Sequence, residues 1–166
     1  KINEEVTNVI KVGLIGLGKT GKHIAREILV EKNMEIVAAV CSPKSTKKGM
    51  DLGELLNTCQ TGIKISTSDE LQSIIFKTKP DVIVDFSNPS STLENALTIS
   101  KMKINMVIGT TGFTKDHINK IQDMTYRFNN GLVYAPNITL GVNVLMLLSN
   151  IAANILNKYD FQITEI

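Results

Sequence analysis

The sequence predicts an α/β fold in which helices cover both faces of a doubly wound parallel sheet. The first observation behind this prediction is that short apolar segments alternate with segments of helical periodicity along most of the chain. The second is that the expected strands are apolar on both faces, as strands with helices on each side are. Right-handed crossovers between successive parallel strands then give the doubly wound arrangement.

The first expected strand spans residues 10–15, Ile-Lys-Val-Gly-Leu-Ile, a mostly apolar segment that is typical of a buried strand. A glycine turn follows and leads into a helix expected from residue 20 to residue 30. A second apolar strand is expected at residues 35–40. The looser segment 50–58 predicts a short helix, and residues 63–65 predict a short third strand.

The alternation continues from Ser68, which is expected to cap a helix that runs through Lys77. Pro80 breaks the chain ahead of a near-continuous apolar strand. The elements expected after Pro80 are strands at 82–86, 105–108 and 131–135, a helix from Ser91 or Thr92 to Met102, and a helix at 115–128. Beyond Pro136 a long helix, apolar on most faces, is expected at 141–157, and residues 161–166 are expected to form a strand.

The composition excludes several classes of protein. A hydrophobic share of 43% is too high for a disordered chain, and a net charge of +2 is too small to indicate a nucleic-acid or membrane partner. No apolar run approaches the roughly 20 residues of a spanning helix, and the polar N-terminus lacks the core of a signal peptide. We therefore expect a soluble, cytoplasmic protein. Cys41 and Cys59 are too few for a disulfide framework or a four-cysteine zinc site, so we expect reduced thiols acting as small hydrophobes and no metal.

The glycine turn after the first strand, Gly16-Leu-Gly18-Lys-Thr-Gly21, matches the G-x-G-x-x-G pattern. In a strand–turn–helix context this pattern is typical of dinucleotide binding: the glycines allow a tight turn, close approach to a pyrophosphate and close helix packing. The helix N-terminus supplies free N–H groups to the phosphates. The alternative is a turn that is rich in glycine for purely steric reasons. We interpret residues 1–135 as a dinucleotide-binding domain.

The end of the second strand bears on the choice between NAD and NADP. An acidic residue there would accept a hydrogen bond from the ribose 2′-hydroxyl, but this strand ends in Cys41-Ser42. Lys44, Lys47 and Lys48 follow, and lysines with a hydroxyl suit a 2′-phosphate. We expect NADPH to be accepted at least. The alternative is a solvated loop whose lysines bind nothing.

Three later segments lie where ligands bind in such sheets, beyond the carboxyl ends of the strands. They are Asp85-Phe-Ser-Asn-Pro89, Gly109-Thr-Thr-Gly-Phe113 and Ala135-Pro-Asn-Ile-Thr-Leu-Gly-Val-Asn143. The threonine loop can pass its backbone near a flat ring or can be an ordinary turn with a capping threonine. Asn137 either orients a carboxamide or caps the turn.

These three segments, in this order and at this spacing from the glycine turn, resemble the signatures of the 4-hydroxy-tetrahydrodipicolinate reductase family, also called dihydrodipicolinate reductases. The resemblance covers nearly the whole chain. It implies a Rossmann-like domain that binds NADPH or NADH and an enzyme that passes hydride to a cyclic dicarboxylate imine in lysine and diaminopimelate biosynthesis. It also implies that the full-length protein is a homotetramer, with residues 136–166 as the hinge, long helix and first strand of an α+β substrate and oligomerisation domain.

The resemblance further implies roles for individual residues. Many members of the family have one more residue in the glycine turn. The residues expected to bind the cofactor are Gly16, Gly18, Lys19, Thr20 and Gly21 at the pyrophosphate, Ser42 and Lys44 at the 2′ group, and Gly109, Thr110, Thr111, Ala135, Asn137 and Ile138 near the nicotinamide. Thr110 and Thr111 are also the residues expected on the substrate side.

The catalytic residues of the family are not expected within this sequence. In the family, a strand similar to residues 160–166 leads into a His-His pair and a nearby lysine, and none of these is present here. His23 and His117 fall on predicted helices and are expected at the surface. The sequence does not begin with Met, and its last strand reads as cut short. The length therefore argues against a complete two-domain enzyme.

Two alternatives remain open at this point. One is a related NAD(P)-dependent amino-acid dehydrogenase of the diaminopentanoate type, which would share the cofactor domain but not the later segments. The other is a dinucleotide-sensing module without catalysis, which agrees with the missing catalytic residues but leaves the substrate-side loops unexplained.

Overall fold

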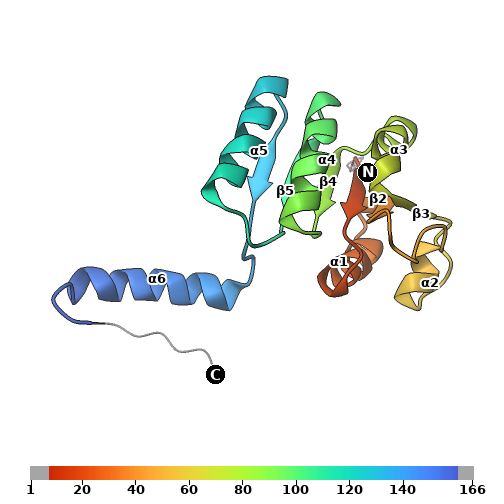
Figure 1. Cartoon of the computed structure of the whole chain (residues 1–166). Helices are drawn as coiled ribbons and strands as arrows, with labels where there is room; N and C mark the ends of the chain where they lie inside the picture. Colours follow the sequence, from red (N-terminus) through yellow and green to blue (C-terminus); the bar gives the residue numbers. More distant parts are fainter. Residues whose placement is uncertain (1–7, 161–166) are drawn as a thin grey trace, which may run out of the picture. The chain divides into compact units, whose positions relative to one another are not determined.

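The computed structural model describes residues 8–160, and its α/β fold confirms the predicted class (Figure 1). Six parallel strands form one sheet in the order β3-β2-β1-β4-β5-β6. The strands are β1 (Ile10–Ile15), β2 (Met34–Cys41), β3 (Ile65–Thr67), β4 (Val82–Asp85), β5 (Asn105–Ile108) and β6 (Leu132–Tyr134). The helices are α1 (Lys19–Val30), α2 (Leu52–Leu56), α3 (Leu71–Thr78), α4 (Pro89–Lys101), α5 (Lys115–Phe128) and α6 (Leu140–Ile155), with a 3₁₀ turn, η1 (Ser68–Glu70), ahead of α3.

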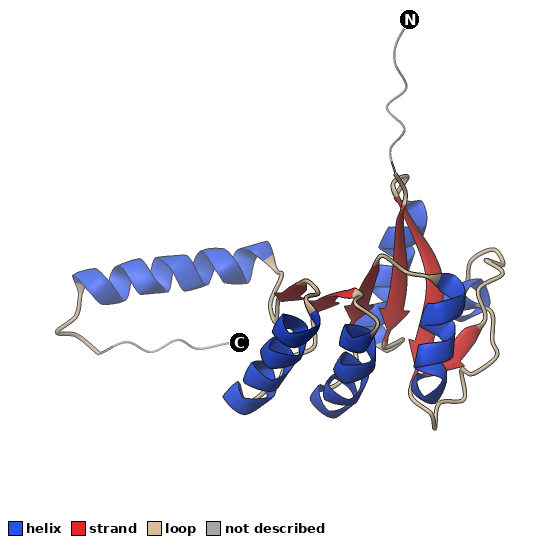
Figure 2. Ribbon diagram, turned by 90° about the horizontal axis from the view of Figure 1, so that it is seen from above, coloured by secondary structure: helices blue, strands red, loops and turns tan. Residues whose placement is uncertain are grey.

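Helices cover both faces of the sheet, as Figure 2 shows. Because side chains alternate along a strand, Val12 and Leu14 of β1 enter one apolar core and Ile15 enters the other. The first core includes Ala25, Ile28, Leu52 and Leu56 from α1 and α2, and the second includes Leu71, Ile75, Ala96, Ile99 and Ile121 from α3, α4 and α5. This arrangement is the doubly wound sheet that the sequence predicts.

The strand order reverses between β1 and β4. From β1 the chain adds β2 and β3 on one side of the sheet, and it then adds β4, β5 and β6 on the other. The last paired residues of the two strands, Ile15 and Asp85, lie side by side. The loops that leave them turn in opposite directions, which opens a crevice at the carboxyl ends of the strands.

The predicted third strand is present, but its predicted bounds of 63–65 are wrong, because β3 spans Ile65–Thr67. The preceding residues pair with a different segment: Asp51 and Lys64 form an isolated antiparallel bridge, and the Leu52 N–H donates to the carbonyl of Ile63 at 2.9 Å. The buried Asp51 side chain fixes this turn, because it accepts from the N–H groups of Gly53, Thr61 and Gly62 at 2.8–3.0 Å. These hydrogen bonds, that from Thr61 foremost, lower the pKa of the Asp51 carboxyl.

Two predicted helix starts also differ from the structure. Ser68 does not cap α3: it is the first residue of the 3₁₀ turn η1, whose cap is Thr67, and α3 follows from Leu71 with Glu70 at its own cap position. The Thr67 N–H donates to Oε2 of Glu70 at the end of the 3₁₀ turn. Helix α4 begins at Pro89, ahead of the predicted Ser91 or Thr92. Proline is tolerated in a first turn because its missing N–H would have no helical partner there. The Asn88 side chain caps this helix by accepting from Ser91 N at 3.0 Å.

The chain divides into two compact units, Lys1–Pro136 and Asn137–Ile166. The second unit contains α6. This helix starts at Leu140, one residue ahead of the predicted start at 141, and ends at Ile155, two residues short of the predicted end at 157. None of the residues of α6 is buried. The expected strand at 161–166 lies outside the described residues. Among the described residues, no helix is both long enough and apolar enough to cross a membrane.

Substitution of Gly21 by alanine is expected to destabilise the first unit. A Cβ at this position would lie 1.7 Å from the carbonyl oxygen of Gly16, so the backbone of the turn would have to move. We expect Gly21→Ala to lower the free energy of unfolding by about 2–4 kcal/mol in urea denaturation. The matched control is Gly18→Ala, because a Cβ on Gly18 meets nothing within 4 Å. Its cost is expected to stay below about 1 kcal/mol. Equal losses for the two variants would contradict this account of the turn.

Candidate functional site

A pocket with a cavity volume of about 210 Å³ lies at the carboxyl ends of β1, β2 and β4, at the crevice where the strand order reverses. The glycine turn, the loop after β2, and the start of α4 with the loop before it form its walls. The lining residues are Ile15, Gly16, Leu17, Gly18, Cys41, Ser42, Ser45, Lys47, Ser68, Phe86, Ser87, Asn88, Ser91 and Asn95. No aspartate or glutamate is among them.

The glycine turn fits closely between the sheet and α1. Gly16 has a φ of +91°, and a Cβ on it would lie 2.5 Å from the backbone of Phe86, so a side chain is excluded on two grounds. The Gly16 N–H donates to the carbonyl of Val40 at 2.9 Å, which ties the turn to β2. Gly18, by contrast, faces open space at the pocket wall.

The N-terminus of α1 leaves its backbone donors free for a ligand. Gly18 occupies the cap position and has no side chain to accept from the first turn. No acidic residue lies in that turn, and Lys19 and Thr20 are exposed. The unsatisfied N–H groups and the positive end of the helix dipole therefore favour an anion beside the turn.

Asn95 contributes a buried polar group to the pocket wall. It lies on α4 and is only 6% exposed, and its Nδ2 has no hydrogen-bond partner among the described residues. A buried amide that lacks a partner is costly, so a donor of this kind at a pocket wall is well suited to an acceptor on a ligand. Ser91, one turn earlier on the same helix, also lines the pocket.

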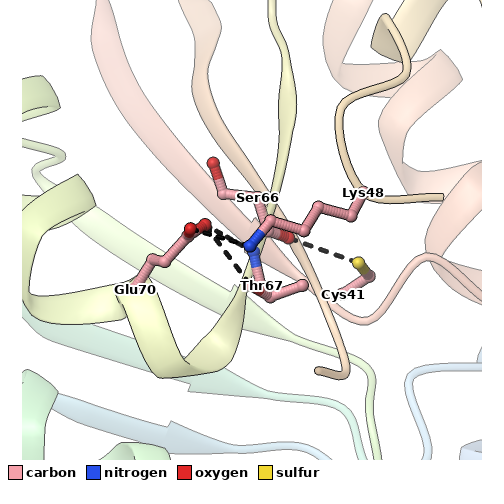
Figure 3. A network of polar contacts seen from close by, with 5 residues as sticks. All are labelled: Cys41, Lys48, Ser66, Thr67 and Glu70. Atoms are coloured by element: carbon pink, nitrogen blue, oxygen red, sulfur yellow. Dashed lines mark hydrogen bonds and ion pairs between the residues drawn. The ribbon is translucent and has the colours of Figure 1, made fainter. Parts of the chain in front are cut away.

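The three lysines that follow β2 have different surroundings. Lys44 is exposed and does not line the pocket. Lys48 donates to Oε1 of Glu70 at 2.8 Å, in the network drawn in Figure 3. This pair raises the pKa of Lys48 and lowers that of Glu70. Lys47 is half-buried and lines the pocket, and its Nζ donates to the carbonyl of Leu17 in the glycine turn at 2.6 Å.

The two cysteines also differ from each other. Cys41 is buried at the end of β2, where its Sγ donates to the carbonyl of Ser66 at 3.3 Å (Figure 3). Cys59 is exposed. Both cysteines are free thiols, as expected. The expectation that they act as small hydrophobes is confirmed for Cys41, which is buried, and is wrong for Cys59, which is exposed. Within residues 8–160, no group of three or more His, Cys, Asp and Glu side chains is placed to hold a metal ion.

A buried carboxylate joins the loops that follow β4 and β5. Asp85 Oδ1 accepts from the N–H and the hydroxyl of Ser87 at 2.8 and 2.6 Å, and from the hydroxyl of Thr110 at 3.3 Å. The Gly109 N–H donates to the Asp85 carbonyl at 3.0 Å, and the ring of Phe86 occupies the space that a Cβ on Gly109 would need. Burial raises the pKa of Asp85, and Oδ2 finds no partner among the described residues.

The structure brings some of the sequence-predicted residues together and leaves others apart. Gly16, Gly18 and Ser42 line the pocket, and Lys19, Thr20 and Gly21 follow the turn in the first turn of α1. Gly109, Thr110, Thr111 and Ala135 follow β5 and β6, and the Ala135 N–H donates to the carbonyl of Ile108 at 2.9 Å. Lys44 lies outside the pocket.

Asn137 and Ile138 belong to the second unit and are exposed there. Asn137 Oδ1 accepts from Thr139 N at 3.0 Å, so within this unit the asparagine closes a local turn. His23 is exposed, as expected. The expectation that His117 lies at the surface is wrong in part, because it is half-buried and stacks edge-on against Phe113 with ring centroids 6.3 Å apart.

The sequence prediction considered Lys47 among three lysines but assigned the 2′ group to Lys44. It also did not assign to the cofactor several other residues of the pocket: Ser45, Ser68, Phe86, Ser87, Asn88, Ser91 and Asn95. For four of these residues the sequence did contain an indication of a role at the site. Phe86 to Asn88 lie in a segment that the sequence places where ligands bind in such sheets, and Ser91 is one of the two residues expected to start the following helix. Asn95 could not be found in this way, because only the packing of α4 against the sheet shows that it is buried.

Comparison with known proteins gives consistent results. The family profile described as "Dihydrodipicolinate reductase, N-terminus" matches residues 10–138. Curated 4-hydroxy-tetrahydrodipicolinate reductases of Methanocaldococcus jannaschii and Methanothermobacter thermautotrophicus are 37% and 35% identical over 158 residues. These matches cover 95% of this chain and 58% of each relative, so the chain spans less than two thirds of their length. A solved dipicolinate-bound dihydrodipicolinate reductase from Paenisporosarcina sp. TG-14 superposes with a TM-score of 0.66 at 25% identity, over 87% of this chain and 54% of that one.

The buried Asp85 predicts an unusual pH dependence of stability. Because its pKa is raised by burial, the folded state holds the proton more tightly than the unfolded state, and this contribution to stability is lost as pH rises through the raised pKa. Asn keeps the acceptor Oδ1 and carries no charge. We therefore expect the urea midpoint of Asp85→Asn at pH 7 to equal or exceed that of the wild type. The advantage should vanish below the ordinary aspartate pKa of about 3.9.

The exposed Asp123 on α5 provides the control for this measurement, since Asp123→Asn should leave the midpoint unchanged at both pH values. A deficit of Asp85→Asn that is larger at pH 7 than at pH 3 would show that the ionised carboxylate stabilises the fold, which would contradict this prediction.

Proposed function

This chain belongs to the dihydrodipicolinate reductase family, and on that basis we propose that it forms the cofactor-binding half of a 4-hydroxy-tetrahydrodipicolinate reductase that uses NADPH or NADH. The reaction would serve lysine and diaminopimelate biosynthesis. The observation that carries the proposal is the pocket at the reversal of strand order, which is lined by the open glycine turn and by Asn95, whose side-chain Nδ2 has no partner among the described residues.

The residues present fit a nicotinamide dinucleotide. The open space at Gly18 admits a pyrophosphate to the free N–H groups of α1, and the absence of carboxylates from the pocket wall avoids repulsion of the phosphates. The Asn95 amide is a donor for a ring nitrogen or a hydroxyl of the adenosine half. Gly16, Gly18, Lys19, Thr20 and Gly21 are assigned to the pyrophosphate.

The loop after β5 is assigned to the nicotinamide half and to the substrate. Thr110 is buried and donates its hydroxyl to Asp85, so its proposed role is to hold the loop. Thr111 is exposed and is the better candidate for contact with a dicarboxylate substrate. Gly109, Ala135, Asn137 and Ile138 complete the proposed nicotinamide set. In the domain assignment, residues 1–135 bind the cofactor and residues 136–166 begin the substrate and oligomerisation domain of a homotetramer.

When bound, the reduced cofactor supplies a hydride, and the substrate nitrogen must also gain a proton. No residue of these 166 is assigned as the acid. His23 and His117 lie on α1 and α5, and His117 is packed against Phe113. We assign the proton donor and the anchors of the dicarboxylate to the part of the relatives that this chain does not match.

The cofactor assignment predicts that Gly18→Ala weakens binding without unfolding the protein. The added methyl group would occupy the space through which the pyrophosphate approaches the turn. In titrations that follow the fluorescence of the reduced cofactor, we expect both NADPH and NADH to lose about tenfold or more in affinity. Gly141→Ala is the matched control, since it also adds a methyl group in open space, but in the second unit. Unchanged affinity for Gly18→Ala would overturn the assignment of the turn.

The assignment of the catalytic acid gives a separate prediction. A protein consisting of these 166 residues alone should bind cofactor but should not reduce 4-hydroxy-tetrahydrodipicolinate, because the substrate would be neither anchored nor protonated. Loss of absorbance at 340 nm in a coupled assay measures this. Turnover above the uncatalysed rate would show that the acid and the anchors lie within this sequence.

A further inference from the structure

We infer that Lys47 is the residue that binds the adenosine 2′-phosphate, so that the pocket prefers NADPH to NADH. The inference rests on the proposed function and assigns a subsite within it. Lys47 replaces Lys44, which the sequence analysis places beside the 2′ group. The choice follows from the surroundings of the three lysines and from the charges of the pocket wall.

The position of Lys47 is set by the loop after β2. The Ser45 N–H donates to the carbonyl of Ser42 at 3.0 Å, and the Lys47 N–H donates to Oγ of Ser45 at 3.2 Å. These bonds fold the loop back on itself, so that Lys47 reaches the glycine turn and its Nζ contacts the carbonyl of Leu17. Lys44 remains exposed and outside the pocket.

Lys47 thus stands between the two features that locate the adenosine ribose. In this fold class the pyrophosphate lies at the glycine turn and the ribose 2′ position lies near the end of the second strand. Lys47 contacts the turn through Leu17, and it lines the pocket together with Ser42, which directly follows β2. A 2′ substituent between these points would lie within reach of the ammonium group.

The charges at this end of the pocket favour a phosphate over a hydroxyl. The Lys47 ammonium group has three N–H donors and uses one on Leu17. Lys48, the next residue, is engaged by Glu70. No carboxylate lines the pocket to accept from a free 2′-hydroxyl, whereas Ser42 and Ser45 offer hydroxyl donors. A half-buried ammonium group with neutral hydroxyls beside it is therefore a site for a dianionic phosphate.

The test compares cofactors that differ only in the 2′ group. For Lys47→Met, we expect the dissociation constant of NADPH to rise about tenfold or more while that of NADH changes by less than about threefold. Lys47→Arg should retain most of the preference. Lys44→Met is the matched control and should leave both constants within about twofold. The fragments adenosine 2′,5′-bisphosphate and AMP should repeat the contrast, because they carry the 2′ difference without the nicotinamide.

Each outcome has a distinct meaning. Equal losses for NADPH and NADH in Lys47→Met would show that the lysine acts on the turn through Leu17, and this would overturn the inference. A selective loss in Lys44→Met alone would overturn it in favour of Lys44. Failure of the wild-type protein to bind either cofactor would instead overturn the proposed function. Thermal unfolding of each variant shows whether the glycine turn has been disturbed.

Discussion

The carbonyl oxygen of Gly16 lies where a Cβ on residue 21 would be, and this contact fixes how the chain leaves β1 and enters α1. Because the helix must pass so close to the turn, its N-terminus is held at the edge of the sheet, beside the place where the strand order reverses. The free N–H groups, the open space at Gly18 and the anchor for Lys47 on Leu17 all follow from that placement.

A second constraint acts across the crevice. The buried Asp85 holds Ser87 on its own loop and Thr110 on the loop after β5, so the pocket wall and the threonine loop are linked through one carboxylate. Its burial has a cost, since desolvation raises its pKa and one oxygen has no partner among the described residues. Unfavourable electrostatics of this kind is common at functional sites. Asp85 thus links the proposed adenosine and nicotinamide ends of one site.

The fold class and the order of elements were predictable because they depend on local patterns. The apolar segments at β1, β2 and β4 are typical of buried strands, and the glycine turn indicates where β1 ends. The errors arose where a distant segment decides the structure. Residues 63 and 64 pair with the segment around Asp51, so β3 begins only at Ile65, and the Thr67–Glu70 contact closes a 3₁₀ turn ahead of α3. The same holds for the pocket, where local patterns were predictable and distant contacts were not. Gly16, Gly18 and Ser42 could be identified from the sequence. Lys47 could not be chosen among the three lysines, because only the folded loop brings its Nζ to the carbonyl of Leu17.

The proposed function requires a dinucleotide to bind at the crevice between β1 and β4. An NMR titration of the ¹⁵N-labelled protein with NADPH tests it most directly. We expect the backbone signals of Gly16, Gly18 and Ser87, together with the side-chain amide of Asn95, to shift in a saturable way with one common dissociation constant. Signals on the outer face of α5, such as that of Asp123, should not move. Saturable shifts that spare the glycine turn and Asn95, or the absence of any shift at millimolar NADPH, would contradict it.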